Sequence, residues 1–96
     1  MKLMAFEREV IGKTEKDFKS HLKSEAEKVW EYFKKGIIRE IYFAKETHEA
    51  VLLLECESKK AAENYLSSLP LVQAGLIRFD VTELVPYDGF ERLFQK

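Results

Sequence analysis

Apolar side chains recur along the first third of the chain with the spacing of an α-helix. Over residues 14–36 the charged positions separate four large apolar side chains that share one stripe at about 100° per residue. The stripe consists of Phe18, Leu22, Val29 and Phe33. Thr14 is a suitable N-cap, and Gly36 suits the left-handed residue that often follows a helix. The pattern predicts one long amphipathic helix.

Four other segments have the composition and spacing of β-strands. Apolar, β-branched and aromatic residues dominate them, and Gly and Pro are absent from their interiors. The predicted strands are residues 2–11, 37–44, 49–57 and 76–85. In the second strand, strict alternation places Ile37, Ile41 and Phe43 on one face and Ile38, Tyr42 and Ala44 on the other.

A second, shorter helix is predicted between the last two strands. Ser58 is its N-cap, and Pro70 ends it before a loop at 71–75. Its inner face consists of Ala61, Ala62, Tyr65, Leu66 and Leu69. The C-terminal tail after Pro86 is too apolar to remain free, so we expect it to dock on a surface.

The order strand, helix, strand, strand, helix, strand is typical of the ferredoxin-like α+β fold, with a four-stranded antiparallel sheet in a single domain over residues 1–96. Two helices cover only one face of such a sheet, yet the strands are apolar on both faces. We therefore expect a homodimer in which two sheets pack face to face, with the tail crossing to the partner, and higher oligomers remain compatible with it.

Composition narrows the classes of partner. Sixteen basic and seventeen acidic residues give a net charge of −1, which argues against a nucleic-acid or acidic-membrane surface as the main partner. No segment has the apolar run of a signal peptide or a membrane span, so the expectation is a cytoplasmic protein. The single Cys56 excludes an internal disulfide, and the sequence predicts no metal site and no cofactor.

Several soft motifs resemble the dimeric α+β barrel superfamily, above all its muconolactone-isomerase-like and YciI-like members. The second helix runs into a Leu-Pro-Leu loop at 69–71, Glu25 lies eleven residues before Gly36, and Tyr42 stands where the family tends to carry Trp. Phe43 departs from the Arg that commonly follows. The resemblance implies a dimeric barrel and a small-molecule substrate.

The chemistry of the chain centres on Glu25, because this carboxylate lies within the apolar stripe of the first helix. A carboxylate in a partly apolar cavity has a raised pKa and can move a proton next to a carbonyl. Alternatively, Glu25 pairs with a neighbouring Lys or Arg. His21 lies one turn earlier, where it either forms an acid–base pair with Glu25 or bonds a backbone carbonyl.

Other side chains are candidates for holding a substrate. Tyr42 is a candidate catalytic hydroxyl, whereas Tyr32 and Tyr65 are candidate binding hydroxyls. The alternative, which the pattern favours for each, is an interior aromatic whose hydroxyl reaches a backbone group. Arg39 can clamp a substrate carboxylate or pair with an acid across the sheet. His48 lies in a polar turn and is expected to be solvated.

Three functional hypotheses follow. The first is a cofactor-independent isomerase that transfers a proton on a small lactone or enol, with Glu25 carrying the proton and His21 and Tyr42 assisting. The second is a non-catalytic dimeric barrel that binds a small ligand. The third, which the resemblance alone suggests, is a cofactor-free monooxygenase.

Overall fold

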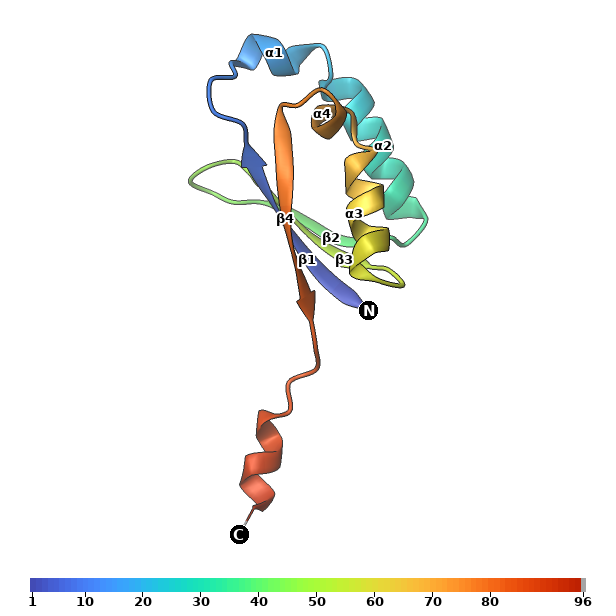
Figure 1. Cartoon of the computed structure of the whole chain (residues 1–96), viewed down its shortest axis with the longest axis vertical. Coiled ribbons are helices and arrows are strands. Elements are labelled where there is room, and N and C mark those ends of the chain that lie inside the picture. The colour runs from blue at the N-terminus through green and yellow to red at the C-terminus, as the bar shows by residue number, and fades with distance from the viewer. Residues whose placement is uncertain (96) are drawn as a thin grey trace.

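The computed structural model describes residues 1–95 and shows a sheet with helices on one side and a projecting C-terminus (Figure 1). Its strands are β1 (Lys2–Glu9), β2 (Ile38–Phe43), β3 (Ala50–Glu55) and β4 (Ile77–Leu84). Its helices are α1 (Glu15–Lys19), α2 (Leu22–Lys34), α3 (Lys59–Ser67), α4 (Pro70–Gln73) and the 3₁₀ helix η1 (Gly89–Phe94).

The sheet is antiparallel throughout, with strand order β2-β3-β1-β4. This order, with helices joining β1 to β2 and β3 to β4, is the ferredoxin-like arrangement that the sequence predicts. Helix α2 contacts β2 and helix α3 contacts β4, so both lie on the same face (Figure 1). The predicted α+β fold is confirmed.

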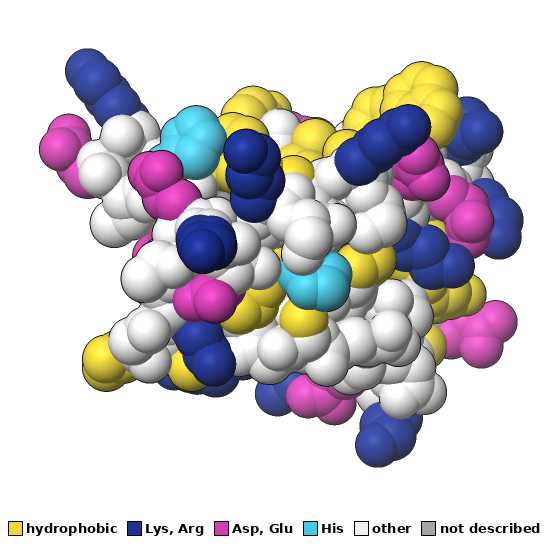
Figure 2. All heavy atoms as spheres, turned by 90° about the horizontal axis from the view of Figure 1, so that it is seen from above, with side chains coloured by type: hydrophobic (Ala, Val, Ile, Leu, Met, Phe, Trp, Pro, Cys, Tyr) yellow, Lys and Arg dark blue, Asp and Glu magenta, His cyan; other side chains and the backbone are white. Residues whose placement is uncertain are grey.

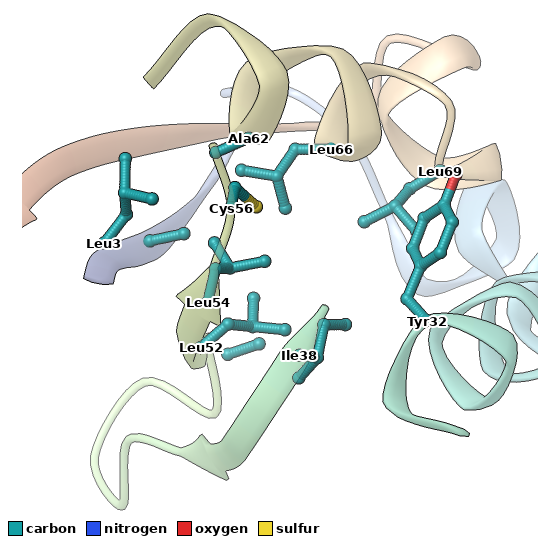
Figure 3. Packing of buried hydrophobic residues seen from close by; sticks show 11 residues of the cluster. Leu3, Tyr32, Ile38, Leu52, Leu54, Cys56, Ala62, Leu66 and Leu69 are labelled. Atoms are coloured by element: carbon teal, nitrogen blue, oxygen red, sulfur yellow. The ribbon is translucent and has the colours of Figure 1, made fainter. Parts of the chain in front are cut away.

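The core fills the space between this face and the two long helices. Leu3, Leu52 and Leu54 rise from the central strands and are at most 1% exposed. Ala62 and Leu66 come down from α3 to meet them (Figure 3). The inner face predicted for the second helix is therefore confirmed, and Ser58 caps it by accepting a hydrogen bond from the Ala61 amide at 3.0 Å.

The predicted alternation of β2 is wrong at its start. The pairing with β3 shifts between Ile38 and Glu40, so Arg39 is an extra residue in a β-bulge. Ile38 pairs with Leu54 and Ile41 pairs with Leu52, which places both on the face that the helices cover. A period-two pattern cannot reveal such an insertion, because one extra residue reverses the facing of all residues before it.

The predicted helix over 14–36 is two helices, because the chain turns at Ser20 and His21 between α1 and α2. Phe18 on α1 packs with a small cluster of Leu71, Leu76 and Ile77, whereas Val29 on α2 packs with the main core. The two segments therefore pack on different clusters, and the bend between the helices allows both contacts. Figure 1 shows α1 lying across the end of the sheet.

Pro70 begins a helix instead of only ending one. Helix α3 ends at Ser67, and Pro70 is the first residue of α4, within the segment expected to be a loop. Proline suits this position because the first helical residue has no intrahelical use for an N–H group. The short helix α4 brings its own N-terminal amides close to α2, and this contact shapes the site described below.

Within residues 1–95, no helix covers the other face of the sheet. Met4, Phe6, Val51 and Leu53 are half-buried there by their neighbours alone. Beyond β4, η1 extends away from the domain and gives the molecule a long dimension of 60 Å (Figure 1). Within one chain the tail does not dock on the domain. The predicted homodimer and the crossing tail stay predictions.

Candidate functional site

A cavity of about 710 Å³ opens between α2 and the helix-covered face of the sheet. This volume is within the range of small-molecule sites. Its lining is mainly apolar and aromatic, with three glutamates and one histidine. The lining residues are Glu7, Glu9, Phe18, Leu22, Glu25, Ala26, Val29, Trp30, Phe33, Ile41, Phe43, His48, Ala50 and Leu71.

Glu25 is one of the residues that line this cavity, which we call the Glu25 cavity. The hypothesis of a functional acid requires this position. Its Oε1 accepts a hydrogen bond from the Leu71 amide at 2.9 Å, at the N-terminal end of α4. Burial raises the pKa of the Glu25 carboxyl, and the hydrogen bond from Leu71 opposes this shift only in part. Within residues 1–95 no ion pair involves Glu25, so its structural partner is a backbone amide and not the Lys or Arg considered from sequence.

A second carboxylate, Glu7, faces the same cavity from β1 and was not identified from the sequence. It is 9% exposed, and its Oε1 accepts a hydrogen bond from the Ala50 amide at 3.2 Å. Burial raises the pKa of the Glu7 carboxyl, and the negative charges of Glu9, Glu49 and Glu25 raise it further. The sequence did contain a signal for Glu7. It continues the alternation of Leu3 and Ala5 along β1, which places its side chain on the inward face of the strand.

His48 also lines the cavity, although the sequence suggested only a solvated turn. Its ring stacks on Phe43 with 4.0 Å between centroids, and its backbone has a φ of 60°. Its position after β2 brings an exposed imidazole to the mouth of the cavity. Figure 2 shows two histidine side chains on the surface seen from above, each beside hydrophobic side chains.

His21 does not reach the cavity lining. It is the N-cap residue of α2, and its carbonyl accepts a hydrogen bond from the Glu25 amide at 2.9 Å. The Ser24 hydroxyl donates to the same carbonyl at 3.0 Å. The spacing of four residues therefore produces a backbone contact between His21 and Glu25, and the predicted acid–base pair of their side chains is not formed.

Tyr42 and Arg39 lie away from Glu25. Tyr42 pairs with Val51 on the uncovered face of the sheet, and its hydroxyl donates to Glu40 Oε1 at 2.7 Å. Arg39 occupies the bulge, where its Nε donates to the Gly36 carbonyl at 2.5 Å. Within one chain neither side chain lies beside Glu25, because Tyr42 is on the uncovered face and Arg39 bonds Gly36 from the bulge. The substrate roles predicted for these two residues stay predictions.

Tyr32 and Tyr65 lie together in the core, at the other end of α2 from Glu25. Their rings meet edge to face with 5.2 Å between centroids. The Ser68 hydroxyl donates to the Tyr65 carbonyl at 2.6 Å, so Tyr32 must donate its own proton to Ser68. Tyr32 points toward the segment between α3 and α4 (Figure 3). Neither hydroxyl faces the Glu25 cavity, and the packing alternative holds for this pair.

Residues 1–95 contain neither a membrane-spanning helix nor a cluster of metal ligands. No helix there has both the length and the apolar character needed to cross a bilayer. No group of three or more His, Cys, Asp or Glu side chains is arranged there as metal ligands would be.

Solved structures with a similar fold include muconolactone isomerase and a dehydrochlorinase. Muconolactone isomerase matches over 92% of both chains with a TM-score of 0.75 and 14% identity. The fold is that of muconolactone isomerase. The 5-chloro-2-hydroxyhydroquinone dehydrochlorinase of Burkholderia phenoliruptrix, in complex with 2,5-dihydroxybenzoquinone, matches over 93% of this chain and 98% of its own with a TM-score of 0.63 and 16% identity. No family model and no curated protein matches the sequence.

Proposed function

We propose that this protein is a cofactor-independent enzyme that moves a proton between two atoms of a small cyclic substrate, in the manner of an isomerase. One observation carries the proposal: Glu25 and Glu7 face one cavity of about 710 Å³, each with a raised pKa. Acids tuned toward neutral pH are effective general acids and bases.

The two carboxyl groups supply the two halves of such a reaction. Ionised Glu25 removes a proton from a carbon next to a carbonyl, and the electron pair moves onto the carbonyl oxygen to form an enolate. A proton is then returned at a different carbon of the conjugated system. Glu7, when protonated, donates a hydrogen bond to the developing oxyanion. Two nearby acids favour one charged and one neutral partner, because each negative charge opposes ionisation of the other.

The charge of the cavity favours an uncharged substrate. In the described chain, the residues that line it include no Lys or Arg, and Arg39 lies outside it. A substrate carboxylate would face Glu7, Glu9 and Glu25 without a cation to offset their charge. A neutral unsaturated lactone or hydroxylated ring avoids this cost and places its ring against Trp30 or Phe43. The two similar structures are named for muconolactone isomerase and for 5-chloro-2-hydroxyhydroquinone dehydrochlorinase, and these names support a small cyclic substrate.

The test is isomerisation of a neutral β,γ-unsaturated butenolide in D₂O, followed by NMR. We expect deuterium to enter the ring as the double bond moves, because the carboxyl exchanges its proton with solvent. Glu25→Gln should slow this reaction by about 10²-fold or more, the usual contribution of a general acid–base group. Glu27→Gln is the matched control, since Glu27 is exposed on the same helix.

An unchanged rate in Glu25→Gln would contradict the proposal, and the hydrogen bond from Leu71 favours a specific alternative. In this alternative, Glu25 serves only to bind the N-terminal amide of α4, and the protein is a binding module that shows no turnover in any variant. Saturable binding of the butenolide without deuterium incorporation in any variant would identify this second function.

A further inference from the structure

We propose that the Glu25 cavity also binds a small organic cation, with a protonated amine between the carboxylates of Glu7 and Glu25 and an apolar body against the aromatic rings at the rim. This ligand class goes beyond the proposed function, because the cation is held in the cavity without reacting. A neutral substrate only avoids repulsion in the cavity, whereas a cation gains attraction.

The floor of the cavity has a carboxylate oxygen without a protein donor. Glu7 is only 9% exposed, and its Oε1 accepts the hydrogen bond from the Ala50 amide, whereas no donor within residues 1–95 reaches its Oε2. No buried side-chain nitrogen or oxygen in this part of the chain lacks a partner, so Oε2 must remain accessible from the cavity that Glu7 lines. An oxygen placed in this way requires a donor from a ligand or from water.

Glu25 supplies a second such oxygen from the helix side. Its Oε1 accepts the hydrogen bond from the Leu71 amide, and no donor in the described chain reaches its Oε2. An alkylammonium group has three N–H donors and no acceptor, so it can satisfy the Oε2 atoms of both glutamates, whereas a hydroxyl can satisfy only one. Its positive charge also offsets the burial that raises the pKa of both carboxyls.

The basic side chains around the cavity are engaged elsewhere. Lys28, less than one turn after Glu25 on α2, forms an ion pair with Glu31 at 3.1 Å. Arg8 follows Glu7 on β1, and its Nε pairs with Asp80 at 3.2 Å. Neither base lines the cavity. Because the whole chain has a net charge of only −1, the negative potential that would attract a cation is local to this cavity.

The walls of the cavity define the rest of the ligand. Trp30 and Phe43 form its rim and are 57% and 61% exposed, and Val29 and Ile41 also line it. A ring joined to the amine by a short chain would remove these apolar surfaces from water while its charge reaches the floor. The Trp30 ring also attracts cations, since Lys34 Nζ lies 5.5 Å from its centroid.

Three compounds with one carbon skeleton and different head groups test the proposal. They are 2-phenylethylammonium, the neutral 2-phenylethanol and the anion 3-phenylpropanoate. Binding is measured at about pH 8, where the amine is protonated and carboxyl groups are ionised. Trp30 is the only tryptophan of the chain and lines the cavity, so its fluorescence reports binding there.

We expect the ammonium to bind about tenfold or more tightly than the alcohol, because hydrogen bonds to charged groups contribute on this scale. The anion should show no saturation at concentrations that saturate the ammonium. The preference for the ammonium should persist in about 0.5 M NaCl, since salt screens a buried pair much less than a pair on the surface.

Variants of the two glutamates assign the preference to the cavity. Glu7→Gln and Glu25→Gln should each lower the affinity for the ammonium by about tenfold and change the affinity for the alcohol less than about twofold. Retained binding of the alcohol also shows that each variant is folded. Glu27→Gln is the matched control, because Glu27 is exposed on the same helix, and it should change neither affinity.

Equal affinities for the ammonium and the alcohol in the natural protein would overturn the proposal. A preference for the ammonium that survives in a Glu7→Gln, Glu25→Gln double variant would also overturn it, because acids on the surface would then account for the attraction. None of these measurements uses turnover. Cation binding can therefore fail while deuterium incorporation depends on Glu25, and it can hold when Glu25→Gln leaves that rate unchanged.

Discussion

The two halves of helix α2 meet the sheet in opposite ways. At the C-terminal half, Tyr32 is buried, donates a hydrogen bond to Ser68 and packs against Tyr65. At the N-terminal half, Glu25 lies over a cavity whose floor contains Ala50 and Glu7. One helix face, with a continuous helical spacing, therefore produces a closed core at one end and an open site at the other.

The difference arises from what lies opposite the helix. Tyr32 packs in the cluster that includes Ile38 and Leu69, which are large and at most 1% exposed. The floor beneath Glu25 combines the small Ala50 with Glu7, which must keep its own hydrogen bond to the sheet. Small side chains and carboxylates cannot fill this space, so the cavity remains. Apolar periodicity on a helix consequently indicates that a face is turned inward, and the facing strands decide whether that face is packed.

The largest expected loss of stability follows a substitution in the C-terminal half of α2, where the helix packs on the closed core. Tyr32→Ala should lower the free energy of unfolding by about 3–5 kcal/mol, because it removes a buried aromatic ring and leaves a void. Guanidinium denaturation followed by circular dichroism measures this change. Leu22→Ala at the open end is the matched comparison, and its side chain is half in solvent. Equal losses in the two variants would show that both ends of α2 are packed alike.

A smaller change in stability separates two roles of Glu25, as a hydrogen-bond acceptor for α4 and as an acid in the cavity. Glu25→Ala should cost about 0.5–2 kcal/mol, since it removes the acceptor that caps the N-terminal end of α4. Glu25→Gln retains an acceptor oxygen, and its free energy of unfolding at neutral pH should equal or exceed that of the natural protein. Urea denaturation of both variants checks this order. A large loss in Glu25→Gln would mean that the negative charge itself stabilises the fold.

The same carboxyls make stability depend on pH. Burial raises the pKa of Glu7 and Glu25 in the folded chain, so folding favours their protonated forms. Their contribution to stability is complete below the ordinary pKa of Glu and is lost as pH rises through the raised values. A Glu7→Gln, Glu25→Gln double variant should therefore gain stability relative to the natural protein as pH increases from about 4. A constant difference between the two proteins in urea denaturation across this range would contradict the shifts.

The fold could be predicted because its signals are local and repeated. Four apolar segments, two helical patterns and their order specify the ferredoxin-like arrangement, and Ser58 caps α3 as its sequence position indicates. The errors fall where one residue departs from a regular period. Arg39 inserts a bulge in β2, and Ser20 lies at a bend between α1 and α2. These departures depend on which distant cluster each segment packs against, which periodicity does not encode.

The candidate site could be predicted only in part. Glu25 was identifiable because a charge on an apolar stripe is anomalous, and Glu7 could have been found by the same reasoning applied to β1. His21 and Tyr42 were assigned by helical spacing and by family resemblance, but the first contacts Glu25 only through the backbone and the second faces away. The position of His48 in the cavity lining depends on how the turn after β2 folds back, and sequence spacing carries no such information.

Substitution of His48 should have the smallest effect on stability. It tests whether the imidazole only shapes the cavity or takes part in the proton transfer. Asparagine tolerates the left-handed φ of 60° as well as histidine does, so His48→Asn should change the melting temperature little, within about 0.5 kcal/mol of stability. The variant removes the imidazole that stacks on Phe43 while leaving Glu25 and Glu7 in place. If the two carboxyls carry the proton transfer, the rate of deuterium incorporation should fall less than tenfold. A loss as large as that of Glu25→Gln would instead make the imidazole an acid–base group of the reaction, because backbone geometry and apolar packing at this exposed turn contribute too little to account for it.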